Sequence, residues 1–311
     1  MKARLLLALL ACFAACVAPA STAVPGTASR GTGFANQRCP AGSSGVVQGK
    51  LMFEALDEAS GLVASRTQPD VYWTHNDSGD SPRAFAIDGH GKSLAELNIT
   101  GIHATDWEDI ALLHTPGKPD RLLMADIGDN WRRRESVDIY VVTEPKVQRA
   151  DEPLALRAPA RRIEVRYEDG ARDAETLLAD PLTGDLYIVE KALFFRFNAT
   201  VGVYRIAAAE TDAEQTIARP VAQVALGPVT AGDVLHDGQG VALRNYHTAR
   251  YFRRDPALPL FEAFADEGCK LPLADAGKQG EALCFARDGA SYYTLAEGRH
   301  EALYRYRLRP R

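Results

Sequence analysis

The sequence predicts an all-β fold, a β-propeller of five blades, in an exported protein. Two observations carry the fold prediction: a degenerate repeat of paired apolar strands, and an acidic residue that opens each copy of the repeat. A third observation, an uncharged apolar run near the N-terminus, carries the prediction of export. Each element is taken in turn below.

The first 20 residues have the features of a secretory signal. A basic head, Met1–Arg4, precedes the uncharged run Leu5–Val17. A short basic segment followed by about a dozen apolar residues is typical of a signal peptide, whereas a membrane-spanning helix needs roughly 20 apolar residues. Ala18-Pro19-Ala20 fits release after Ala20, so we expect residues 1–20 to be removed.

A second interpretation of the same segment stays open. Phe13-Ala14-Ala15-Cys16 resembles a bacterial lipobox, in which Cys16 becomes the acylated first residue of the mature chain. Phe13 stands where Leu is usual. The sequence therefore predicts a periplasmic, extracellular or lipid-anchored protein without a transmembrane helix.

The mature chain is acidic and begins with a flexible tether. Loss of Lys2 and Arg4 with the signal changes the formal net charge from -5 to -7, which disfavours a nucleic-acid partner. Residues 21–44 are rich in Ser, Thr, Gly, Ala and Pro and are predicted to be a linker. Residues 45–311 suffice for one large all-β domain, which we expect to be monomeric.

Five copies of one strand pattern follow. In each, an acidic residue opens a short apolar strand, a turn follows, and a second apolar strand ends in polar or charged residues. Intervals of 48 to 67 residues between the opening acids fit four-stranded propeller blades. Five copies predict five blades, and six is the alternative if the long interval 108–175 hides a short blade. The opening acids are Glu58, Glu108, Glu175, Asp233 and Glu281.

The last copy lacks a fourth strand, and a spare strand precedes the first copy. The chain ends after the third strand of the last copy, Ala302–Leu308, whereas the apolar segment Gly45–Phe53 lies before the first opening acid. We predict that the N-terminal strand completes the C-terminal blade and closes the ring, which removes exposed sheet edges.

Three cysteines remain after processing, in a compartment that permits disulfides. Cys269 and Cys284 are close in sequence, so we predict a bond between them and a free Cys39. A bond between Cys39 and Cys284 is the alternative, and the absence of any bond also stays open because spacing does not fix connectivity.

The opening acids predict an acidic mouth at one end of the central channel, because the first strand of each blade lines that channel. Crowded carboxylates repel unless they are protonated, paired or metal-bound. Hard oxygen ligands in an exported protein favour calcium, and Lys191 and Arg244 are available as partners for some of the acids. The predicted metal ligands are Glu58, Asn76, Asp77, Glu108, Asp126, Glu175 and Asp233, and the predicted channel-lining residues are Glu190, Asn245, Glu281 and Glu297.

Two residues near these acids are candidate bases. Asp106 belongs to the densest acidic cluster, Asp106-Trp107-Glu108-Asp109, and His75 precedes Asn76-Asp77. A base beside a metal ion activates water for hydrolysis. The sequence has no Gly-x-Ser-x-Gly elbow and no phosphate-binding or dinucleotide fingerprint.

Three motifs carry a resemblance that covers most of the mature chain. Trp73–Asp80, Asp106–Ala111 and Ala125–Asn130 resemble an uncharacterised group of bacterial secreted or lipoprotein β-propellers. The chain is more distantly similar to calcium-dependent gluconolactonase-like and phytase-like propellers, which implies a metal over the channel mouth. Likeness of fold alone does not establish function.

Two hypotheses follow. In the first, a calcium-binding mouth hydrolyses an ester, lactone or phosphoester of a small molecule. In the second, the protein is a non-catalytic module of the cell envelope, and its metal is structural.

Overall fold

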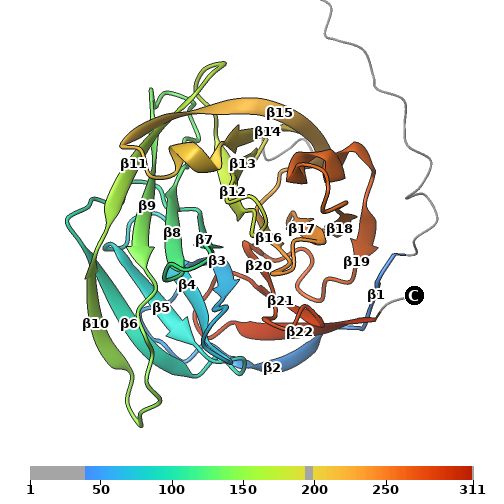
Figure 1. The fold of residues 1–311 in the computed structure, drawn as a ribbon. Coiled ribbons are helices and arrows are strands. Elements are labelled where there is room, and N and C mark those ends of the chain that lie inside the picture. Colours follow the sequence, from blue (N-terminus) through green and yellow to red (C-terminus); the bar gives the residue numbers. More distant parts are fainter. Residues whose placement is uncertain (1–38, 193–198, 310–311) are drawn as a thin grey trace, which may run out of the picture. The chain divides into compact units, whose positions relative to one another are not determined.

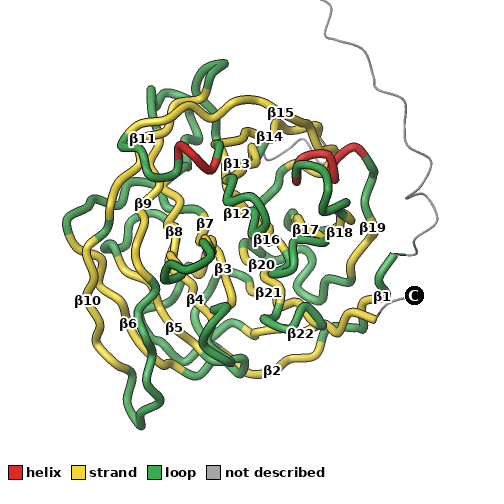
Figure 2. The backbone as a smooth tube through the Cα atoms, in the orientation of Figure 1, coloured by secondary structure: helices red, strands yellow, loops and turns green. Residues whose placement is uncertain are grey.

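The computed structural model describes residues 39–192 and 199–309. Nearly all of the regular structure in these residues is strand, as the yellow segments of Figure 2 show. The helical segments described are two short 3-10 helices, η1 (Ala208–Glu210) and η2 (Leu260–Ala265). The predicted all-β class is confirmed.

The strands form successive antiparallel units, each of which begins with an inner strand and continues outward (Figure 1). The first three units are β3 (Ala59–Ala64), β4 (Tyr72–Asn76), β5 (Arg83–Ile87) and β6 (Ser93–Thr100); β7 (Asp109–Leu113), β8 (Arg121–Asp126), β9 (Val137–Thr143) and β11 (Arg161–Tyr167); β12 (Ala174–Ala179), β13 (Leu186–Glu190), β14 (Ala199–Ile206) and β15 (Gln215–Gly227). The next are β16 (Ala231–Val234), β17 (Gly240–Arg244), β18 (Ala249–Arg253) and β19 (Cys269–Leu271); then β20 (Ala282–Phe285), β21 (Ser291–Leu295) and β22 (Ala302–Arg309).

The inner strands close into a ring. The contacts run from β3 to β7, β12, β16 and β20, and β20 in turn contacts β3. Each predicted repeat start marks one inner strand: Glu58, Glu108 and Glu281 directly precede theirs, whereas Glu175 and Asp233 lie within theirs. This cyclic order of sheets is that of a β-propeller, as the sequence predicts.

The N-terminal strand completes the last unit, which confirms the predicted closure. β2 (Val46–Lys50) pairs antiparallel with β22, Val46 opposite Arg305. A second short strand, β1 (Ala41–Gly42), pairs with the far end of β22. The predicted linker ran to residue 44, so the folded part begins earlier than predicted because β22 is long enough to pair with both strands.

Two parallel strand pairs, which the repeat pattern does not predict, join neighbouring units. β10 (Leu154–Pro159) adds to the outer edge of β6 in the preceding unit. The first part of β15 pairs with β11, so two units share one eight-stranded sheet. Both pairings cover strand edges that would otherwise be exposed.

Burial along the strands explains their composition. All six residues of the inner strands β3 and β12 are buried, since both faces pack against neighbouring units. The outer strand β10 alternates between half-buried and exposed residues, as a strand covered on one face does. The apolar clusters lie between units: one joins Leu62 and Phe85 of the first unit with Leu295 of the last.

The disulfide joins Cys39 to Cys269, so both predicted pairings that use Cys284 are wrong. Cys39 precedes β1, which lies beside β22, and Cys269 opens β19 on the outer edge of the neighbouring unit, with a Cα–Cα distance of 5.6 Å. Cys284 is a free buried thiol in the inner strand β20. Nearness in sequence misled the prediction because one blade ends at its outer strand while the next begins at the channel.

The predicted signal peptide, Cys16 and the linker up to residue 38 lie outside the described residues. Among the residues that are described, no helix has the length and apolar character needed to cross a membrane.

Candidate functional site

One end of the ring gathers acidic residues from several units. In every hairpin, the start of the inner strand and the end of the second strand lie side by side, so residues flanking these points meet at one end. We call this set the acidic mouth. Its members are Asp77, Asp106, Glu108, Glu175, Lys191, Glu281 and Glu297.

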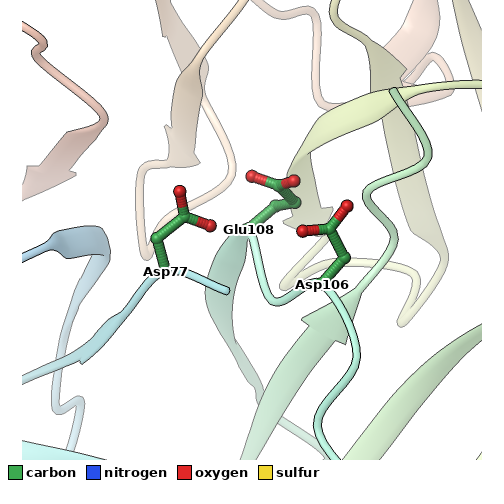
Figure 3. A group of neighbouring side chains, drawn as sticks. All are labelled: Asp77, Asp106 and Glu108. Carbon is green, nitrogen blue, oxygen red and sulfur yellow. The ribbon is translucent and has the colours of Figure 1, made fainter. Parts of the chain in front are cut away.

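Three carboxylates form the centre of the acidic mouth. Carboxylate oxygens of Asp77, Asp106 and Glu108 lie within 4.8 Å of one another. Figure 3 shows the three side chains converging from the end of β4 and the start of β7. A second group, formed by Asp77, Glu281 and Glu297, meets the same criterion. Asp77 is common to both groups, so the carboxylates form one continuous acidic surface.

Backbone hydrogen bonds hold this geometry. The N–H of Glu108 donates to the carbonyl of Ala125 at 2.9 Å, and the N–H of Gly128 donates to the carbonyl of Asp106 at 3.2 Å. A Cβ at Gly128 would collide with the carboxylates of Glu108 and Asp106. The absence of a side chain at Gly128 therefore allows the two acids to converge.

Burial and mutual repulsion raise the pKa values of these acids. Burial, and next the Asp77 carboxylate, raise the pKa of Glu108 well above its usual range. Burial raises the pKa of Asp77 to about 6 and also raises that of Asp106. Burial and the neighbouring Glu281 raise the pKa of Glu297 to about 9. The site is therefore short of positive charge.

The positive charge present is already engaged. The Lys191 ammonium pairs with Glu175, which confirms that Lys191 serves as a partner for the acids. Arg244, the other predicted partner, is fully buried and pairs with Asp275 at 2.9 Å instead. The hydroxyl of Tyr246 donates to Glu281 at 3.0 Å. Among the described residues, no ion pair or hydrogen bond engages the Glu108 carboxylate, although the charge of Lys191 acts to lower its pKa.

Asn76 and Asp126 were predicted as metal ligands, but their side-chain oxygens bind the backbone. Asn76 accepts the N–H groups of residues 57 and 58, and Asp126 accepts those of residues 105 and 106. The two residues lie 50 residues apart, as Glu58 and Glu108 do. They are equivalent supports for the loops that enter β3 and β7. Asp126 also pairs with Arg134 at 2.8 Å.

Asp233 likewise binds backbone rather than the acidic mouth. Its Oδ2 accepts the N–H of Phe285 in the next inner strand at 2.8 Å, and its Oδ1 accepts the N–H of Val234. In the same way, Oδ2 of Asp109 accepts the N–H of Leu177 in the next inner strand at 2.8 Å. These two aspartates connect neighbouring blades.

Three further predicted residues lie outside the converging carboxylates. Glu58 is exposed. Glu190 pairs with Arg132 at 2.8 Å. Asn245 is buried and caps its own turn by accepting the N–H of Thr248 at 2.7 Å. The structure thus brings together Asp77, Asp106, Glu108, Glu175, Glu281 and Glu297 and separates the rest.

His75 has surroundings that argue against the predicted base role. It is 0% exposed and packs edge-on against Trp107, with Nδ1 donating to the carbonyl of Asn76 at 2.7 Å. Burial lowers the pKa of His75 to about 4. Asp106, the other predicted base, is half-buried within the acidic mouth.

A groove of about 350 Å³ adjoins the carboxylates, and the sequence analysis did not identify it. It is lined by Asp106, Gly128, Trp131 and Arg134 among others. Trp131 is 78% exposed, whereas Trp107 and Trp73 are buried. An exposed tryptophan beside a charged site is suited to contact a ligand. The segment Asp129–Arg134 combines a tryptophan with three arginines, a composition that suits ligand contact. Whether its tryptophan is exposed depends on the tertiary structure.

Comparison with known proteins adds a likeness of fold. No family model matches the chain, and no curated protein matches it. Many solved chains match in structure. One is the crystal structure of RRP9 WD40 repeats, with a TM-score of 0.47 and 10% identity over 88% of this chain and 100% of that chain.

Proposed function

We propose that this protein is an exported β-propeller that binds a divalent cation, calcium, at its acidic mouth. The ion is held by Asp77, Asp106 and Glu108, and it positions an oxygen-rich small ligand in the groove beside Trp131. As part of the same proposal, the protein is one of the bacterial secreted or lipoprotein propellers. It is either released after Ala20 or lipid-anchored through Cys16.

Glu108 is the observation that carries the proposal. Its side chain is 4% exposed and points toward two other carboxylates, and the lysine that lowers its pKa, Lys191, forms its ion pair with Glu175 instead. A buried carboxylate without a partner is costly unless it is protonated or metal-bound. A cation among these three side chains would satisfy all of them at once.

The donor set favours calcium among divalent ions. All three candidate ligands are carboxylates, and within the described residues no histidine or cysteine joins the group. Calcium takes six to eight oxygen ligands in flexible geometry. Carboxylates on two separate loops, with room toward the groove for water or ligand oxygens, suit that requirement.

Calcium-dependent stability tests the proposal. Metal-free protein should melt at a higher temperature when calcium is added, and the shift should grow with the calcium concentration. At a calcium concentration 100 times the dissociation constant, binding raises the free energy of unfolding by about 2.7 kcal/mol. Glu108→Gln should abolish most of this response, yet should leave the metal-free protein at least as stable, because it removes a buried repulsive charge.

Glu262→Gln is the matched control, since Glu262 is exposed on η2 away from the carboxylates. It should respond to calcium as the unmodified protein does. No response of the unmodified protein to any divalent ion would refute the proposal.

A more specific version of this proposal is that the protein hydrolyses an ester, lactone or phosphoester. A bound ion supplies Lewis-acid polarisation of a ligand oxygen. In this form Asp77 and Glu108 hold the ion and Asp106 is the base, because burial raises its pKa and it borders the groove. Turnover that is lost in Asp106→Asn while the calcium response is retained would support catalysis. A calcium response without turnover of such substrates would favour the non-catalytic cell-envelope module.

A further inference from the structure

The end of the ring opposite the acidic mouth carries basic residues. The turn between an inner strand and its second strand lies at this end. Arg66 lies in the turn between β3 and β4, His236 in that between β16 and β17, and Arg287 in that between β20 and β21. These turns also hold acidic residues, among them Asp70, Asp237 and Asp288, so the partners of each basic side chain decide whether its charge is available.

A pocket of about 500 Å³ opens beside these turns. It lies between the first and last units, where the rings of Tyr72 and Tyr293 pack at a tilt of 56° with 4.9 Å between their centroids. We call it the basic pocket. Residues lining it include Arg66, Tyr72, His236, Arg287, Tyr293 and Arg305.

The three arginines of the basic pocket are anchored, and each by few of its donors. Arg66 Nη1 donates to the carbonyl of His236 at 2.8 Å, and Arg287 Nε donates to the carbonyl of Arg66 at 2.7 Å. Arg305 Nε donates to Ser291 Oγ at 3.1 Å. No other hydrogen bond joins these guanidinium groups to a described side chain or carbonyl, and the guanidinium of Arg305 also lies over the Tyr293 ring, 5.8 Å from its centroid. The arginines are thus positioned without being saturated.

No carboxylate of the described residues forms an ion pair with these arginines. Two acids do line the pocket, but each is engaged elsewhere. Asp70 pairs with Arg149 at 3.2 Å, and Asp288 accepts the N–H of Ala290 in its own turn at 2.9 Å. In a chain with a net charge of -5, three guanidinium groups that line one pocket and form no ion pair with a described residue indicate an anionic partner.

His236 adds a neutral polar group. Its Nδ1 is buried and has no hydrogen-bond partner among the described residues. Burial, and next the Arg66 guanidinium, lower the pKa of His236, which favours the neutral ring. A buried polar atom without a partner at a pocket wall is a position that a ligand or water completes.

We propose that the basic pocket is a second ligand site, which binds a small molecule through an oxyanionic group held by Arg66, Arg287 and Arg305. Guanidinium groups bind carboxylate and phosphate through paired N–H donors, so the recognised chemistry is that of either oxyanion. The site lies at the opposite end from the carboxylates and is independent of the cation proposal.

The site is tested by titrating the protein with inorganic phosphate and, separately, with citrate. Divalent ions and chelator are first removed from the protein. Calorimetric titration at constant ionic strength, set with sodium chloride, should show saturable binding of at least one of the two anions. The anion that binds identifies the source of the oxyanion. Loss of a charged hydrogen-bond donor should weaken it, so Arg287→Gln and Arg305→Gln should each reduce affinity about tenfold.

Arg157→Gln is the matched control, because Arg157 is exposed on β10 and has no ion pair among the described residues. It should bind the anion as the unmodified protein does. The proposal is overturned if neither anion binds, or if the two pocket variants bind as tightly as Arg157→Gln. Unchanged melting temperatures of the folded variants separate loss of the site from loss of the fold.

Discussion

The acids of the inner and second strands perform two different tasks, and their hydrogen bonds separate the two. Asp126 and Asp233 accept backbone N–H groups, whereas among the described residues no backbone N–H donates to the Glu108 carboxylate. A carboxylate that accepts backbone N–H groups is committed to the fold. One without such partners is available to an ion.

Gly128 offers a test at the residue scale that removes no charge. A Cβ there would displace the carboxylates of Glu108 and Asp106, which are flexible side chains, so Gly128→Ala should fold. We expect calcium affinity to fall about tenfold or more, since the ligands can no longer converge. Calorimetric titration measures this, and calcium binding of unchanged affinity would contradict it.

Asp233 gives a prediction for pH. Burial raises its pKa to about 7, from an ordinary value of 3.8, so the folded state favours the protonated form. Its contribution to the free energy of unfolding is present below pH 4 and is lost as pH rises through 7. Asp233→Asn should therefore flatten the decline in stability between pH 4 and 7.

Urea unfolding across this pH range measures the effect. Asp151→Asn, at an exposed position, should leave the decline unchanged. If Asp233→Asn and Asp151→Asn gave the same pH dependence, the role assigned to Asp233 would be wrong.

At the residue scale the sequence identified the right types of residue but could not sort them. Asn76 and Asp77 are adjacent, yet one binds backbone and the other joins the acidic mouth. Neighbouring residues of a strand project to opposite faces, and which face meets the channel depends on where the strand ends.

Short N-terminal elements tie together strands that are distant in sequence. β1 pairs with β22, and the disulfide beside it connects Cys39 with Cys269 across a separation of 230 residues. A bond that closes so long a loop restricts the unfolded chain strongly.

Removal of this bond gives a prediction at the scale of the element. The double variant Cys39→Ser/Cys269→Ser should lower the free energy of unfolding by about 2 to 5 kcal/mol. Urea unfolding with and without reductant measures this. Reductant should destabilise the unmodified protein and leave the double variant unchanged, because Cys284 is a buried free thiol in both. Insensitivity of the unmodified protein to reductant would contradict the prediction.

Element order was predictable where pairing is local and not where it crosses between units. The hairpins of β3 with β4 and of β20 with β21 follow from turn residues and apolar runs. The parallel pairing of β10 with β6 does not, because a strand that joins a preceding unit has no local signature.

The closure of the ring is a property of the whole molecule. β2 covers the edge of β22, and β20 contacts β3 across the junction of the two chain ends. Without β1 and β2, the edge of β22 would be free to pair with another chain.

Deletion tests closure. A chain that begins at residue 51 should associate or aggregate, whereas one that begins at residue 39, with β1 and β2 retained, should elute as the longer chain does. Size-exclusion chromatography with light scattering measures both. If the two deletions behaved alike, β2 would not be needed to protect the edge of β22.

The sequence by itself determined the strand repeat, the class of fold, the closing role of the N-terminal strand and the end of the ring at which acids gather. These follow from local patterns: period-two apolar runs, turn residues and the position of each acid at the start of a strand. Only the tertiary structure decided the Cys39–Cys269 bond, the different roles of Glu108 and of Asp126 and Asp233, and the placement of Arg66, Arg287 and Arg305 around one pocket. The physical reason is that these features depend on contacts between units, and such contacts arise when the ring closes and residues far apart in the chain become neighbours.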